Sequence, residues 1–106
     1  MDYISINVTF DNNEEAEKCV QDLLEKKLVS CCQLFPIKSK YRWKGKIETS
    51  EEICVMMKSK KTLFKKIKEC ILTHHSYDIP EIITYSILDG HRPYLKWIDD
   101  ETDSID

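Results

Sequence analysis

The chain has 106 residues and a formal net charge of −3, which indicates one small domain and argues against nucleic acid as its partner. No apolar run approaches the roughly 18 residues of a membrane span, so we expect no membrane partner. The N-terminus lacks the basic and apolar regions of a signal peptide, so we expect none. Five cysteines, an odd number without a C-x-x-C pair or a secretory context, favour reduced thiols and a cytoplasmic location over a disulfide framework.

The N-terminal third predicts a strand followed by a helix. Apolar and polar residues alternate over 3–10, which is typical of a strand with one buried face. Residues 11–13 are turn and N-cap material, and helical spacing of apolar residues then predicts a helix at about 13–27. Cys19 joins the apolar stripe of this helix, and we interpret it as a small core residue.

A long hairpin is predicted next. Residues 28–43 form an extended region that breaks at Pro36, which indicates an edge position or a bulge. Gly45 provides a turn to a second strand that begins at Ile47. After two glutamates interrupt the pattern, residues 53–57 are apolar on both sides. That composition indicates a strand covered by helices on one face and by another subunit on the other.

The second half predicts a helix, a strand and a short last helix. The helix opens at Lys60 or Lys61 with Thr62 as its cap, and its lysines form either a solvated face or a surface for phosphate or an acidic partner. Its apolar stripe comprises Leu63, Ile67, Cys70, Ile71 and His74. A strand follows at 79–88. Residues 92–98 start a short last helix, with a proline in its first turn.

The resulting order is β-α-β-β-α-β with an added C-terminal helix. This is the α+β, ferredoxin-like arrangement of an antiparallel sheet with two helices on one face. We assign residues 1–100 to a single domain and residues 101–106 to an acidic, frayed tail. Because unrelated functions share this fold, the fold alone assigns none.

Two adjacent histidines, His74 and His75, stand at the end of the second predicted helix. Imidazole nitrogens suit copper, zinc or nickel, which makes the pair a candidate metal site. Two ligands are visible, however, where most sites need three or four. The alternative is structural, because histidines near a helix C-terminus are favoured by the helix dipole.

Four segments of the chain stand in a distinctive order and spacing. They are Leu28-Val29-Ser30-Cys31-Cys32-Gln33, Tyr41-Arg42-Trp43-Lys44-Gly45-Lys46, His75-Ser76-Tyr77-Asp78-Ile79-Pro80-Glu81-Ile82 and Tyr94-Leu95-Lys96-Trp97-Ile98. Together they resemble the CutA family, the divalent-cation tolerance proteins, over about residues 5–98. The second segment matches the family pattern Tyr-x-Trp-x-Gly-Lys, and the third matches His-Pro-Tyr-x-x-Pro-Glu-Ile except that Ser76 replaces the first proline.

The resemblance implies a tight homotrimer whose long second and third strands pair between subunits, with a link to copper tolerance and no established enzymatic reaction. It also implies a copper site made of a first-strand cysteine and two consecutive histidines. The histidines carry over to His74 and His75, but Val8 stands at the cysteine position. A third ligand would then come from another subunit or from His91.

Aromatic residues and one carboxylate indicate a ligand cleft between subunits. Its predicted members are Trp43, Tyr77, Glu81, Tyr94 and Trp97. Aromatic walls around a polar group are typical of small-ligand pockets. Alternatively, the two tryptophans anchor the subunit interface and Glu81 pairs with a basic residue of a neighbouring subunit.

Two functions follow from these features. The first is a homotrimeric module that binds copper or another divalent metal; the second is a trimeric signalling or assembly protein that binds an unidentified protein or small molecule in the cleft, with metals incidental. We expect no enzymatic activity, because no nucleophile–base motif is present and only Gly45 and Gly90 are glycines, too few for a phosphate-binding loop.

Overall fold

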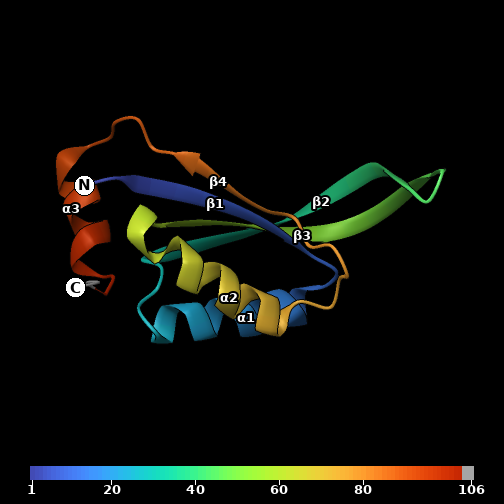
Figure 1. Ribbon diagram of the computed structural model, residues 1–106, viewed down its shortest axis with the longest axis horizontal. Coiled ribbons are helices and arrows are strands. Elements are labelled where there is room, and N and C mark those ends of the chain that lie inside the picture. Colours follow the sequence, from blue (N-terminus) through green and yellow to red (C-terminus); the bar gives the residue numbers. More distant parts are fainter. Residues whose placement is uncertain (104–106) are drawn as a thin grey trace.

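A computed structural model describes residues 1–103, and their elements follow the predicted order. The elements are β1 Tyr3–Phe10, α1 Asn13–Glu25, β2 Cys31–Trp43, β3 Lys46–Lys60, a 3₁₀ turn Lys61–Leu63, α2 Phe64–His74, β4 Ile82–Ser86 and α3 Arg92–Asp100. The four strands form one antiparallel sheet in the order β2-β3-β1-β4. Helices α1 and α2 lie side by side on one face of it (Figure 1). The α+β class is therefore confirmed, and none of the helices in this part of the chain has the length and apolar character needed to cross a bilayer.

The core lies between this helix pair and the sheet. Ile6, Val8 and Phe10 of β1 are fully buried, as the alternation predicted. Cys19 is also fully buried on α1, which confirms its role as a small core residue. Each large apolar side chain buried here contributes about 1.5–3 kcal/mol relative to exposure, so the two helices are held firmly against the sheet.

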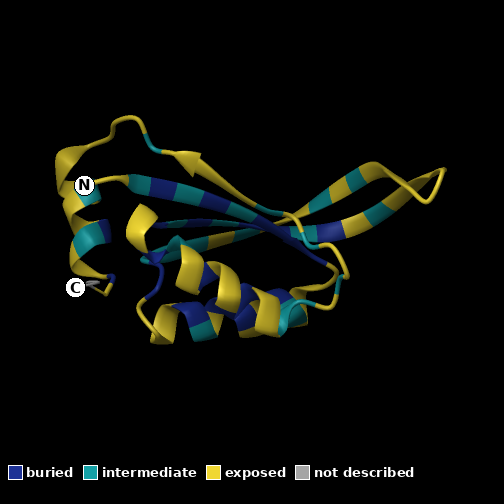
Figure 2. Ribbon diagram, viewed as in Figure 1, coloured by how far each residue is buried: buried dark blue, intermediate teal, exposed yellow. Residues whose placement is uncertain are grey.

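The β2–β3 hairpin extends beyond the helices, and its tip is largely exposed (Figures 1 and 2). Lys44 and Gly45 turn the chain with φ of 49° and 80°, the left-handed conformation that a two-residue hairpin requires. Pro36 lies on β2, an edge strand of this sheet, as predicted. The two glutamates that interrupt the apolar pattern lie within β3, which is continuous. Glu52 is buried there and accepts a hydrogen bond from the Tyr77 hydroxyl at 2.7 Å.

Several predicted boundaries are also corrected. Helix α1 stops at Glu25, because Lys27 adopts a left-handed φ of 56°. Thr62 caps nothing, since α2 is preceded by a 3₁₀ turn and receives no side-chain cap. Strand β4 is shorter than the predicted 79–88, and α3 continues to Asp100.

The beginning of the acidic tail is packed rather than frayed. Thr102 is buried, and its hydroxyl donates to the Ile98 carbonyl at 2.8 Å. The buried Lys60 ammonium lies 3.0 Å from the Asp99 carboxylate, which ties α3 to the end of β3. Residues 104–106, the rest of the predicted tail, lie outside the described part of the chain.

The face of the sheet opposite α1 and α2 carries apolar side chains, and we call it the outer sheet face. Directly paired residues of an antiparallel sheet point to the same side, and the register places Asn7, Phe35, Met56, Ile83 and Tyr85 on this face. Phe35, Ile83 and Tyr85 are each at least 40 % exposed. The buried Asn7 Oδ1 has no hydrogen-bond partner within residues 1–103.

Candidate functional site

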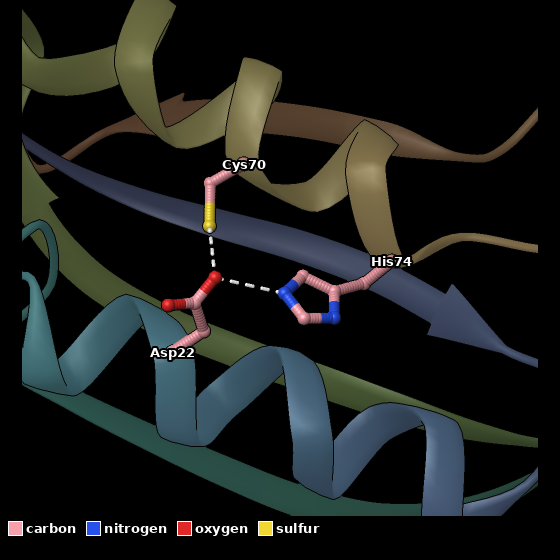
Figure 3. Close-up of side chains that lie close together, drawn as sticks. All are labelled: Asp22, Cys70 and His74. Carbon is pink, nitrogen blue, oxygen red and sulfur yellow. Dashed lines mark hydrogen bonds and ion pairs between the residues drawn. The ribbon is translucent and has the colours of Figure 1, made fainter.

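Three potential metal ligands of different chemistry converge where α1 faces the end of α2. Cys70 and His74 are one helical turn apart on α2, so both project from the same side of that helix. Asp22 reaches them from α1, and its Oδ2 atom lies 2.8 Å from His74 Nε2 and 3.3 Å from Cys70 Sγ (Figure 3). One ligand atom from each residue lies within 4.8 Å of the others. Cys70 is buried, whereas the side chains of Asp22 and His74 are partly exposed.

The hydrogen bonds of this Asp22–Cys70–His74 cluster define its charge. Bonds donated by His74, by Lys26 and by Cys70 lower the pKa of Asp22 to about 2. Burial and the hydrogen bond to Asp22 raise the pKa of the Cys70 thiol to about 11. At neutral pH the cluster is therefore a carboxylate that accepts from a neutral thiol, from an imidazole N–H, and from the Lys26 ammonium at 3.2 Å.

His75 has a different environment from His74. Its side chain is 1 % exposed, its Nε2–H donates to the Thr9 carbonyl at 2.6 Å, and its Nδ1 accepts from the Tyr77 N–H at 3.2 Å. The ring stacks on Phe10 at a centroid distance of 4.7 Å. Both ring nitrogens are thus used within the protein. The structure does not bring the two predicted histidines into one ligand group, because only His74 faces the cluster.

Three of the predicted cleft residues meet in one pocket. Trp43, Tyr77 and Glu81 line a cavity of about 580 Å³ between the hairpin and the segment that follows α2. Lys38 and Lys40 of β2 also line this pocket, so it presents positive as well as negative side chains. Burial and the hydrogen bond to Glu52 raise the pKa of Tyr77, so its hydroxyl stays protonated and donates.

The other two predicted cleft residues lie elsewhere in the protomer. Tyr94 and Trp97 of α3 pack against each other at a centroid distance of 5.5 Å. The Tyr94 hydroxyl lies 3.7 Å from Cys31 Sγ, which places Cys31 against α3. Neither residue lines the pocket that contains Trp43.

Two other positions were considered in connection with a metal site: Val8, where the family has its cysteine, and His91, the possible third ligand. Neither contributes to the cluster. Val8 is fully buried on β1 between Val55 and Ile82 and offers no ligand atom. His91 is exposed at the start of α3. Neither belongs to a group of three or more metal-ligating residues within the described part of the chain.

Sequence reasoning missed Asp22 and Cys70 as site residues. The spacing of Cys70 and His74 was a usable signal, because residues i and i+4 of a helix share a face. Asp22 carried no such signal, since it belongs to another helix and lies 52 positions before His74.

Comparison with known proteins gives a consistent match over most of the chain. Residues 4–101 match the family model described as CutA1 divalent ion tolerance protein. The divalent-cation tolerance protein CutA of Pyrococcus horikoshii is 38 % identical over 99 residues, which cover 93 % of this chain and 97 % of that protein.

Structures of similar proteins agree with the fold. CutA1 from Oryza sativa superposes with a TM-score of 0.95 at 30 % identity and covers 99 % of this chain and 97 % of that one. The periplasmic divalent cation tolerance protein CutA from Archaeoglobus fulgidus has a TM-score of 0.93 at 37 % identity, with 95 % and 99 % covered.

Proposed function

Because this chain belongs to the CutA1 divalent ion tolerance family, we propose that it is a homotrimeric module that binds copper or another divalent cation. The observation that carries the metal-binding part is the position of His74 Nε2. It lies beside a carboxylate and a thiol at a place that solvent reaches. Nitrogen, oxygen and sulfur donors together suit borderline divalent metals, so the residues present fit such an ion.

His75 supports this site but is not a metal ligand. Its two backbone hydrogen bonds and its stack on Phe10 hold the chain immediately after α2. Such contacts fix the orientation of the last helical turn, and a rigid supporting structure sharpens ligand geometry.

The trimer part of the proposal is supported by the outer sheet face. A sheet face that carries three exposed large apolar side chains is typical of an interaction surface. Covering it with copies of the same chain would bury Phe35, Ile83 and Tyr85. It would also cover the second face of the apolar segment of β3, as its sequence predicts.

Metal binding is tested by competition titration with Cu(I) and Zn(II) under reducing conditions. We expect the parent to bind about one ion per chain, His74→Ala to lose it, and His91→Gln, a histidine outside the cluster, to keep it. Equal affinity of the parent and His74→Ala would contradict a role for His74, and no tight binding by the parent would contradict the function itself.

The assembly is tested by sedimentation at micromolar concentration. We expect a trimer for the parent, and a smaller species for Phe35→Lys/Tyr85→Lys on the outer sheet face. Leu72→Lys, at a half-exposed position on α2, is the matched control and should remain trimeric. A monomeric parent would contradict the proposal.

The pocket around Trp43 supports a second candidate function. A trimeric signalling or assembly protein would bind a small molecule or a protein segment there, with Tyr94 and Trp97 of a neighbouring subunit completing the cleft. Lys38 and Lys40 favour an anionic group. A ligand that binds only the folded state raises the melting temperature, so a thermal-shift screen of nucleotides and small anions on the parent and on Trp43→Ala distinguishes this candidate from the first.

The proposed role is binding rather than catalysis, with no nucleic-acid or membrane partner. A cytoplasmic location remains a prediction, and one relative of known structure is periplasmic. Cell fractionation tests it directly.

A further inference from the structure

We propose that Asp22, Cys70 and His74 are the three protein ligands of a zinc ion, with a fourth position open to water. This inference rests on the proposed metal-binding function, but it names the ligands and the metal. It differs from the ligand set expected from the sequence, because two of the three residues come from outside the histidine pair and His75 is excluded.

The spacing of the donor atoms fits a tetrahedral ion. Zinc bonds of roughly 2.0–2.3 Å place neighbouring ligand atoms roughly 3.3–3.8 Å apart. Asp22 Oδ2 already lies 3.3 Å from Cys70 Sγ and 2.8 Å from His74 Nε2, and all three atoms lie within 4.8 Å. The three donor atoms therefore already converge on one point, although the Asp22 and His74 atoms must separate slightly to admit the ion.

The helices that carry the ligands are rigidly placed. Leu23, next to Asp22, and Ile71, next to Cys70, are both fully buried in the core. The ligands are thus preorganised by packing that does not depend on metal. The side chains of Asp22 and His74 are 28 % and 26 % exposed, which leaves a path for the ion and space for a water ligand.

The donor set favours zinc over Cu(I). A thiolate and a carboxylate together supply two negative charges, which match a divalent ion, and imidazole is a common zinc ligand. Cu(I) prefers sites rich in thiolate or thioether, and the cluster contains a single sulfur. On binding, the Cys70 S–H bond is replaced by a sulfur–zinc bond and that proton passes to solvent. The His74 proton moves from Nε2 to Nδ1, which makes no hydrogen bond within residues 1–103.

Lys26 acts as a built-in competitor for the ion. Its ammonium lies 3.2 Å from the same Asp22 Oδ2 atom that accepts from His74 and Cys70. Zinc must displace this cation from the carboxylate, because two positive charges so close together repel each other. Lys26 is more than half exposed, so its side chain can swing into water when zinc arrives.

The first experiment is a zinc competition titration against a chromophoric chelator, with the protein stripped of metal and kept reduced. Asp22→Asn, Cys70→Ala and His74→Gln should each weaken zinc binding by at least about 100-fold, since loss of supporting groups alone costs 10–100-fold. Cys54→Ala and His91→Gln, matched residue types outside the cluster, should leave the affinity unchanged. Melting curves in chelator establish that each variant is folded.

Two further measurements distinguish a metal site from a cluster whose hydrogen bonds are only structural. Co(II) as a substitute ion should produce a near-ultraviolet cobalt–thiolate charge-transfer band, which Cys70→Ala abolishes and Cys54→Ala retains. Lys26→Met should bind zinc roughly three- to tenfold more tightly than the parent, because the competing charge is gone. A purely structural role predicts neither effect.

The outcomes are distinguishable. Zinc binding by the parent that survives all three cluster variants would overturn this ligand set and leave the proposed metal-binding function intact. A cobalt complex without the thiolate band would overturn Cys70 as a ligand. If the parent binds no zinc, this inference fails, and retained Cu(I) binding would then show that the proposed function survives without it.

Discussion

Replacing His75 by alanine should destabilise the fold far more than replacing its neighbour His74. The His75 ring is 1 % exposed, and its loss leaves the Thr9 carbonyl and the Tyr77 N–H without their partner. Both hydrogen bonds are part-buried, so each group left without a partner costs at most about 1–3 kcal/mol, and the lost stack on Phe10 adds about 0.5–1.5 kcal/mol. With partial replacement by water, we expect His75→Ala to cost about 3–5 kcal/mol in total.

His74→Ala removes only a partly exposed pair with Asp22. Such pairs contribute about 1 kcal/mol or less, so the two adjacent histidines should differ by at least about 2 kcal/mol. A variant that replaces both would therefore lose metal binding partly through unfolding, and only the single His74 variant reports on ligation.

The assay is urea-induced unfolding followed by circular dichroism, in chelator and at one fixed protein concentration, because assembly makes stability concentration-dependent. His75→Gln is the control, since its amide can both donate and accept, and it should recover part of the loss. Equal costs for His74→Ala and His75→Ala, or a cost below about 1 kcal/mol for His75→Ala, would refute this account of His75.

Three further predictions concern other contacts. The folded pKa of Asp22 is about 2, below its usual value near 4, so its stabilising effect is present above pH 4 and is lost as the pH falls towards 2. The unfolding free energy of metal-free Asp22→Asn should therefore fall less steeply with pH in that window than that of the parent. Identical curves would contradict the prediction. Tyr77→Phe removes a 2.7 Å hydrogen bond to the buried Glu52 carboxylate, which should lower the unfolding free energy by about 1.5–3 kcal/mol in urea titrations. Because the pKa of Tyr77 is raised, spectrophotometric titration of Tyr77→Phe should lose a tyrosine that ionises above pH 10 in the parent. Asp99→Asn leaves the buried Lys60 ammonium without its counter-charge. It should lower the unfolding free energy by about 2–3 kcal/mol, below the range for fully buried pairs because Asp99 is partly exposed. Amide hydrogen exchange should accelerate first in α3, and unchanged protection of α3 would argue against the pair as its anchor.

Several elements were predictable because their signals are local. The alternation over β1 matches its buried face, and Asn12 caps α1 by accepting from the Glu15 N–H at 2.9 Å. The turn at Gly45 was predictable because glycine readily adopts the positive φ that this turn requires. Distant contacts are not visible in such signals: Glu52 is buried within β3, where the Tyr77 hydroxyl donates a hydrogen bond to its carboxylate.

The candidate site, too, was predictable where local signals act and not where distant contacts decide. The sequence by itself determined the fold class, the element order and the presence of chemically capable residues near the end of α2, because periodicity and capping act over a few residues. Only the tertiary structure separated the two histidines. Helix α2 ends at His74, and His75 adopts an extended conformation with φ −89° and ψ 135°, so one ring points to Asp22 and the other enters the core beside Thr9. These partners lie 52 and 66 positions away in the chain, and contacts of that range depend on how the helices pack on the sheet, which no local pattern encodes.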